Sequence, residues 1–288
     1  MNCVTPIAPV RAGAIGVCAL VVSGLLAGCS PTPLATLPDG VTVAIQQNRD
    51  DYGPRRLEIV VTNDGDDEVT VTHASFESSG FVAPASWDRP ATIAPGTTTN
   101  LRVQLAAADC AVDAPSSRVE IDFTLADGQE GSATVTPTDP FDAISTVTTQ
   151  DCAADAVGEI VEITLAESLR TEQRDGRPVA LLDVTFTPTG DPRPVTVQSV
   201  SDTILVRSPT STGWSVDQTL TAASAPLVVT LDFIPNNCRL HTVAEDKRGT
   251  YFPVTVLTDQ GESTFPVAAS TAVKKQVYAY IADYCGWD

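Results

Sequence analysis

The feature that most constrains the fold of this chain is an internal repeat that covers nearly all of it. The offset between matching positions grows only from 125 residues near the start of the repeat to 133 at its end. The matching positions are Leu57 and Leu182, Val69 and Val195, Trp87 and Trp214, Cys110 and Cys238, and Cys152 and Cys285. A repeat of this length predicts two copies of one structural unit, with the differences in spacing confined to loops.

Most of each copy alternates apolar and polar residues with a period of two, which is the pattern of a half-buried β-strand. Short turn segments such as Asp64-Gly65 and Asp127-Gly128 separate these runs. The clearest runs are Val41–Ile45, Leu101–Leu105, Val161–Leu165 and Val229–Phe233. The pattern predicts an all-β fold of two tandem immunoglobulin-like β-sandwich domains, at residues 39–155 and 156–288, with Trp87 and Trp214 in their cores.

Helical spacing of apolar residues predicts a short helix at the end of each copy. In the first copy Asp139-Pro140 is expected to supply the N-cap and the first helical residue. The apolar residues at helical spacing are Phe141, Ile144 and Val147 in the first copy and Val273, Val277, Ile281 and Tyr284 in the second. A further helical segment is predicted from Asn237 to Lys247, with Leu240 and Val243 facing inward.

Residues 1–28 are predicted to be an export signal. Arg11 is the only charged residue before Asp39, and residues 12–28 are uncharged and mostly apolar, which is short for a membrane-spanning helix. The segment Leu26-Ala27-Gly28-Cys29 resembles the lipobox of bacterial lipoproteins. The resemblance implies cleavage before Cys29, lipid attachment to its thiol, and a Pro/Thr/Ser-rich tether over residues 29–38. An ordinary signal or a membrane anchor is the alternative.

The seven cysteines divide into three groups under this interpretation. Cys3 and Cys18 leave with the signal and Cys29 carries lipid, which leaves four cysteines in an oxidising compartment and predicts two disulfides. Four cysteines allow three pairings. The repeat favours one disulfide within each copy, Cys110–Cys152 and Cys238–Cys285. Closing loops of this length contributes about 4 kcal/mol each in the chain-entropy description.

Charge and motifs exclude several classes of function. The chain has 36 acidic and 17 basic residues, a net charge of −19, which counts against nucleic acid as a partner and against adhesion to an anionic membrane through the protein surface. Residues matching H-E-x-x-H, G-x-S-x-G, the P-loop or G-x-G-x-x-G are absent from the sequence. We therefore expect no enzyme activity, no catalytic residue, no cofactor and no metal site.

The candidate binding residues are His241, Glu245, Asp246 and Trp287. His241 and Glu245 lie four residues apart, so a helix places them on one face with Asp246 beside them. They can form a solvated surface pair, or supply two metal ligands or an acid–base couple, although no third His or unpaired Cys lies nearby. Trp287 follows the last cysteine and is expected either to be exposed or to cap the second sandwich. His73 is expected on the polar side of a strand, and the acidic run Asp64–Glu68 is expected to form a solvated turn rather than a calcium site.

The chain after the signal resembles tandem-domain lipoproteins of high-GC Gram-positive bacteria that have no assigned activity. The residues that carry this resemblance are Leu26–Cys29, the repeated cysteines and Cys238-x-x-His241-x-x-Ala244-Glu245-x-Lys247. It implies a lipid-anchored protein on the extracytoplasmic face of the cell membrane. We expect a non-enzymatic binding or scaffolding module whose partner is a protein or a cell-wall polymer. The alternatives are a small-ligand or cation-binding accessory protein of a transporter and, more remotely, a hydrolase that uses two carboxylates.

Overall fold

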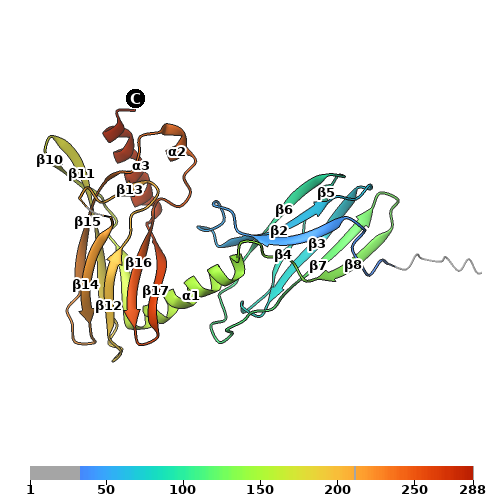
Figure 1. Cartoon of the computed structure of the whole chain (residues 1–288), viewed down its shortest axis with the longest axis horizontal. Coiled ribbons are helices and arrows are strands. Elements are labelled where there is room, and N and C mark those ends of the chain that lie inside the picture. Colours follow the sequence, from blue (N-terminus) through green and yellow to red (C-terminus); the bar gives the residue numbers. More distant parts are fainter. Residues whose placement is uncertain (1–32, 211, 288) are drawn as a thin grey trace, which may run out of the picture. The chain divides into compact units, whose positions relative to one another are not determined.

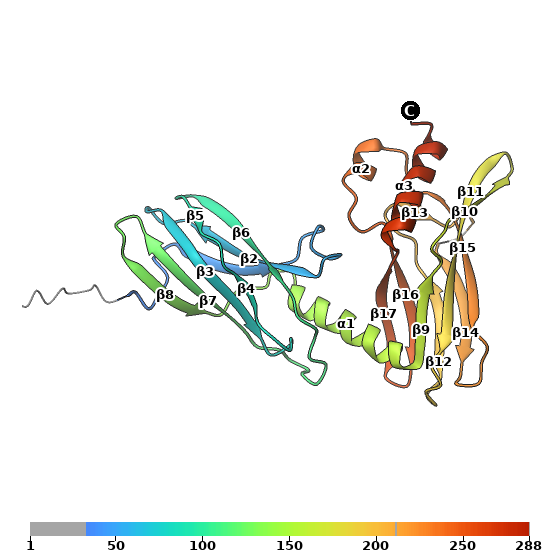
Figure 2. The same ribbon diagram turned by 180° about the vertical axis from the view of Figure 1, so that it is seen from behind.

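The computed structural model describes residues 33–210 and 212–287, which form two β-sandwiches in tandem and three helices (Figures 1 and 2). The predicted all-β fold class is confirmed. The predicted signal at residues 1–28 and the lipid-attachment residue Cys29 lie outside the described residues. No helix within the described ranges is long and apolar enough to cross a membrane.

The first sandwich is built from two antiparallel sheets. One sheet has the order β1-β2-β6, with β1 at Val41–Gln46, β2 at Arg56–Asn63 and β6 at Thr97–Gln104. The other has the order β4-β3-β7-β8, and β5 also pairs with β3. The bounds of these strands are Val69–Ser78 for β3, Ala85–Trp87 for β4, Ala91–Ile93 for β5, Ser117–Leu125 for β7 and Glu130–Val135 for β8. The inward residues of both sheets form one core, which includes the fully buried Ile59 and Leu101.

The second sandwich follows the same plan. In one sheet β11 pairs with β9, β10 and β15, and β15 also pairs with β13. The other sheet has the order β14-β12-β16-β17. The bounds are Val161–Leu165 for β9, Arg170–Arg174 for β10, Arg177–Pro188 for β11, Val195–Val200 for β12, Val206–Arg207 for β13, Trp214–Leu220 for β14, Leu227–Pro235 for β15, Tyr251–Thr258 for β16 and Gly261–Ala268 for β17.

The sequence repeat is also a repeat of strand order and register. The order β4-β3-β7-β8 in the first sandwich corresponds to β14-β12-β16-β17 in the second. Leu57 pairs with Val103 across β2 and β6, and the matching Leu182 pairs with Leu231 across β11 and β15. A shift of one residue would turn every inward side chain to the other face, so the shared hydrophobic alternation fixes the same register twice.

The helix that follows the first sandwich differs from the prediction. Helix α1 spans Ala143–Ile160, so it is 18 residues long instead of short, and the predicted boundary between residues 155 and 156 falls inside it. The carboxylate of Asp139 accepts hydrogen bonds from the backbone N–H groups of Ala143 and Ile144 at 2.8 and 2.9 Å. It therefore caps the helix from three residues before the N-cap position, which is Asp142 and not Asp139 as predicted, and Phe141 lies exposed before the first turn.

The two helices of the second copy lie close to their predicted positions. Helix α3 spans Thr271–Cys285, and Val273, Val277 and Ile281 are fully buried, as their spacing predicted. Helix α2 spans only Leu240–Ala244, shorter than the predicted segment from Asn237 to Lys247. Val243 is buried as predicted, but the prediction for Leu240 was wrong, because its side chain is exposed. Helix α2 is only about one turn long, so it buries Val243 but not Leu240.

The expected tether does not extend as far as Pro38. Leu34 forms a parallel bridge with Gly131 at the start of β8, through hydrogen bonds from its N–H to Glu130 O at 3.0 Å and from Ser132 N–H to its carbonyl at 2.8 Å. The side chains of Leu34 and Leu37 pack against the first core. Residues 34–37 are therefore part of the first sandwich, because burial of the Leu34 and Leu37 side chains against its core stabilises this position.

Candidate functional site

Both disulfides have the pairing that the repeat favoured. Cys110 is bonded to Cys152 and Cys238 to Cys285, with Cα–Cα distances of 5.5 Å in each case. Each bond joins the loop after the last strand of one sheet to the helix that follows the other sheet. One end of each sandwich is thereby cross-linked to a helix.

The residues at the predicted candidate site separate in the structure. His241 Nε2 lies 3.3 Å from Glu245 Oε2, and both side chains are largely exposed, as in the surface-pair interpretation. Asp246 is buried instead and turns inward, where its carboxylate accepts hydrogen bonds from Gly249 N–H at 2.9 Å and from the Tyr278 hydroxyl at 3.1 Å. Burial and the neighbouring Asp246 carboxylate raise the pKa of Tyr278 well above its ordinary value. The Asp246 carboxylate thus joins the loop that follows α2 to helix α3.

The tryptophans, His73 and the acidic run that the sequence analysis singled out all pack against, or pair with, neighbouring residues or form a turn. Trp287 is half-buried against the second core, so it caps that sandwich. Trp214 is buried, but Trp87 is only half-buried, with Arg89 stacked 4.0 Å over its ring. His73 Nδ1 lies 2.7 Å from Asp88 Oδ1 on the outer side of β3. The run Asp64–Glu68 joins β2 to β3 between the two sheets, and its four carboxylates are exposed.

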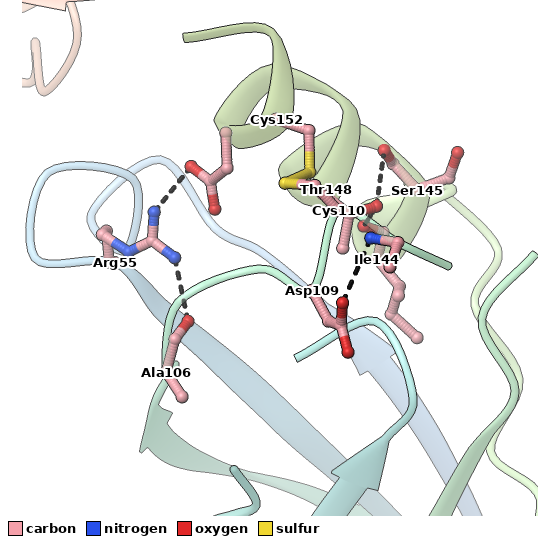
Figure 3. Close-up of a disulfide and its surroundings, with 10 residues drawn as sticks. Arg55, Ala106, Asp109, Cys110, Ile144, Ser145, Thr148 and Cys152 are labelled. Carbon is pink, nitrogen blue, oxygen red and sulfur yellow. Dashed lines mark hydrogen bonds and ion pairs between the residues drawn. A yellow bond between two sulfur atoms is a disulfide. The ribbon is translucent and has the colours of Figure 1, made fainter. Parts of the chain in front are cut away.

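The disulfide end of the first sandwich is held by contacts that sequence reasoning did not predict (Figure 3). Arg55 has a φ of 54° and directs its guanidinium to α1, where Nη1 donates to Asp151 Oδ1 at 2.6 Å. Its Nη2 donates to the carbonyl of Ala106 at 2.9 Å. Arg55 therefore ties the loop before Cys110 to the helix residue next to Cys152, in parallel with the disulfide.

A groove of about 460 Å³ opens at this end. Its walls are the loop between β3 and β4 and the loop that carries Cys110. Apolar contact is offered by Phe81, Val82 and Val112, and Val82 is 65% exposed. Glu77 and Arg118 lie at its edge and form an ion pair at 2.6 Å. The groove thus combines an apolar floor with a charged edge.

The groove walls are bonded to each other by their backbones. Asp109 N–H donates to Gly80 O at 2.8 Å, and Val82 N–H donates to Ala107 O at 3.0 Å. Gly80 lies so close to the second wall that a Cβ there would be 2.9 Å from Cβ of Pro115. The close approach requires glycine, and the two backbone hydrogen bonds join the walls without a partner.

A second polar cluster lies on the outer face of the β1-β2-β6 sheet, under the loop between β1 and β2. Glu58 is only 1% exposed and is surrounded by donors. Its Oε2 accepts from the side-chain amides of Gln46 at 3.0 Å, Asn100 at 2.7 Å and Asn48, and its Oε1 accepts from Arg102 Nε at 2.9 Å. Four donors suit an ionised carboxylate.

Asp51 meets a different environment in the same cluster. It is fully buried, and neither of its carboxylate oxygens has a hydrogen-bond partner, although Oδ1 lies 3.3 Å from Arg102 Nε. Burial and the negative charge of Glu58 raise the pKa of Asp51, and Arg102 opposes them. Both effects favour the protonated form of Asp51, in which its hydroxyl can donate to the neighbouring Glu58 carboxylate.

The second sandwich carries a simpler version of this cluster at the matching position. Asp183, the equivalent of Glu58, accepts hydrogen bonds from Arg170 Nη2 at 2.7 and 2.8 Å and from Thr230 Oγ1 at 2.7 Å. Its side chain is 30% exposed, in contrast to the 1% of Glu58. The alternation of the strands places an acid on the outer face twice, and in the first sandwich Asn48 and Asp51 of the loop between β1 and β2 lie beside Glu58.

The sequence matches no protein-family model, and no curated protein is similar to it. A red sea bream transglutaminase structure is 11% identical, with a TM-score of 0.22 over 81% of this chain and 32% of that one, so the chain spans about a third of its length. The CsuC–CsuE chaperone–tip adhesion subunit complex of Acinetobacter baumannii is 10% identical, with a TM-score of 0.18 over 80% of this chain and 99% of that one. Scores this low carry nothing about function.

Proposed function

We propose that this protein is a lipid-anchored, extracytoplasmic binding or scaffolding module without enzymatic activity, whose partner is a protein or a cell-wall polymer. The observation that supports it is the preformed groove of about 460 Å³ at the disulfide end of the first sandwich. Its walls are fixed by Cys110–Cys152, by Arg55 and by backbone hydrogen bonds, so binding of a partner loses little conformational entropy of these loops.

The chemistry of the groove favours an extended partner segment. Val82 and Phe81 offer apolar contact, and Ser79, Ser116 and Asp109 offer polar groups along the walls. A few apolar contacts with polar groups around them are typical of sites that bind by shape and hydrogen bonding. The two sandwiches then act as a support that presents the groove outside the cell.

The test is cross-linking and capture from intact cells with the Cys29-anchored chain and two matched variants. Val82→Glu places a charge in the groove, whereas Val228→Glu places one at a position 56% exposed on β15 of the second sandwich. We expect Val82→Glu to reduce the captured partner by about tenfold and Val228→Glu to leave it unchanged. Equal capture by both variants would contradict the proposal.

A second candidate function, cation binding, is favoured by one observation. Asp51 and Glu58 place two buried carboxylates beside each other, and hard cations such as calcium prefer oxygen ligands. Arg102 competes for the same carboxylates. Calorimetric titration with calcium and with zinc separates the two candidate functions. Binding heat that disappears in Asp51→Asn would support cation binding at this cluster. No heat with either ion would contradict cation binding.

A further inference from the structure

The segment that leads into the first sandwich is fixed to one particular end of it. Leu34 runs parallel to β8 beside Gly131, next to the turn between β7 and β8, so the chain enters from the turn side. From Leu37 it crosses to β1, whose first residue pairs with the last residue of β2, Asn63. The entry of the chain, the β7–β8 turn and the β2–β3 loop therefore share one end of this sandwich.

The stretch of sequence between Cys29 and this end is short. Four residues lie between Cys29 and Leu34, and the five steps from one to the other reach at most about 18 Å in a fully extended chain. The expected ten-residue tether would have allowed about twice that reach. Because Leu34 and Leu37 are committed to the first core, a lipid on Cys29 keeps this end of the sandwich close to the bilayer.

This end is strongly acidic, and the groove lies at the opposite end. Within residues 33–40, 62–69, 94–98 and 125–131 there is no Lys or Arg. The exposed carboxylates there are those of Asp39, Asp64, Asp66, Asp67, Glu68, Asp127 and Glu130. The groove lies near Ser117, where β7 begins, whereas β7 ends at Leu125 beside the turn. Nine residues of strand separate the two ends by about 26 Å.

We propose that the acidic end formed by the β7–β8 turn, the β2–β3 loop and the docked segment at Leu34 is the membrane-facing end of the first sandwich, and that it holds the groove away from the lipid. The inference rests on the proposed lipid anchoring at Cys29. The lipid surface attracts this end only through the anchor, because anionic headgroups repel its carboxylates. The short link is therefore what keeps it there.

The test places a dye on the lipidated full chain at Ala126→Cys in the acidic turn or at Val82→Cys in the groove. Vesicles of phosphatidylcholine contain a nickel-chelating lipid, which quenches only dyes close to the surface. We expect strong quenching at position 126 and several-fold weaker quenching at position 82. Ten Gly/Ser residues inserted between Thr32 and Pro33 add about 17 Å of reach, so quenching at position 126 should fall several-fold. The fall should be larger when phosphatidylglycerol is included.

The same ten residues appended after Asp288 are the matched control and should leave both signals unchanged. Equal quenching at the two positions, or stronger quenching at position 82, would overturn the proposed orientation while vesicle binding persists. Co-sedimentation with the vesicles measures the anchoring itself. Its absence in the chain carrying an intact Cys29 would overturn the lipid anchoring, and the orientation with it.

Discussion

At the scale of single residues, burial decides what each acidic side chain does in this acidic protein. Glu58 and Asp183 occupy matching strand positions and both meet an arginine. Glu58 is closed off from water with Asp51 beside it, whereas Asp183 keeps contact with solvent. A buried carboxylate needs a complete set of donors or a proton, and a half-exposed one is stabilised by water.

The first prediction concerns the proton on Asp51. An acid whose pKa is higher in the folded than in the unfolded state binds more protons when folded, so it favours folding below its ordinary value of 3.8, and this contribution is lost as the pH rises through the folded-state pKa. We expect Asp51→Asn to raise the free energy of unfolding at pH 8 by about 1 kcal/mol and to have less effect at pH 5.

Urea unfolding at both pH values measures this difference. The control is Asp50→Asn, which removes the same charge from the exposed neighbouring residue and should change stability little at either pH. If Asp51→Asn instead destabilised the protein at pH 8, Asp51 would be an ionised partner of Arg102 and not a proton donor to Glu58.

The second prediction compares the two matching acids. Glu58→Ala removes a buried carboxylate that accepts hydrogen bonds from three side-chain amides and from Arg102, and we expect a loss of about 3 kcal/mol. Asp183→Ala removes a partly exposed ion pair, for which we expect a loss below about 1 kcal/mol. Chemical denaturation of each variant supplies both values, and similar losses would show that the covering loop does not control the energetics.

At the scale of elements, strands and loops differ in how closely they follow the sequence. The strands of both sandwiches pair in matching registers, because the two copies share one alternation of apolar residues and a wrong register exposes a whole apolar face. The placement of residues 34–37 and the length of helix α1 are determined by packing against other parts of the fold. Short Pro/Thr-rich sequence carries little local preference, so the core decided its placement.

The third prediction tests the docked segment. A chain that begins at Pro38 lacks the two backbone hydrogen bonds to β8 and the side chains of Leu34 and Leu37, and we expect the first sandwich to lose about 2 kcal/mol. A chain that begins at Pro33 keeps these contacts and should match the longer chain. Hydrogen exchange of Ser132 N–H reports the loss directly, and unchanged protection in the shorter chain would contradict the docking.

At the scale of the whole molecule, the chain has two hydrophobic cores, and each sandwich contains its own core and its own disulfide. The first core and the second core share no residue, and each disulfide lies within one copy. Cross-links that close 42 and 47 residues restrict the unfolded chain by similar amounts.

The fourth prediction follows from that separation. Replacing Cys110 and Cys152 together by alanine should destabilise the first sandwich by about 4 kcal/mol and leave the second nearly unchanged, and replacing Cys238 and Cys285 should do the reverse. Differential scanning calorimetry, with hydrogen exchange to assign each transition, makes the comparison. A single transition lowered equally by either pair would mean that the two sandwiches unfold as one.

The sequence by itself determined the all-β class, the twofold repeat and both disulfide pairings, because each follows from periodicity along the chain or from the match between its two copies. Only the tertiary structure decided that Leu34 belongs to the first sandwich, that Asp51 is buried against Glu58, and that loops 78–84 and 109–118 enclose a groove. Each of these depends on segments far apart in the chain meeting at one place, and the free energy of such a meeting comes from desolvation and hydrogen bonding that no local pattern records.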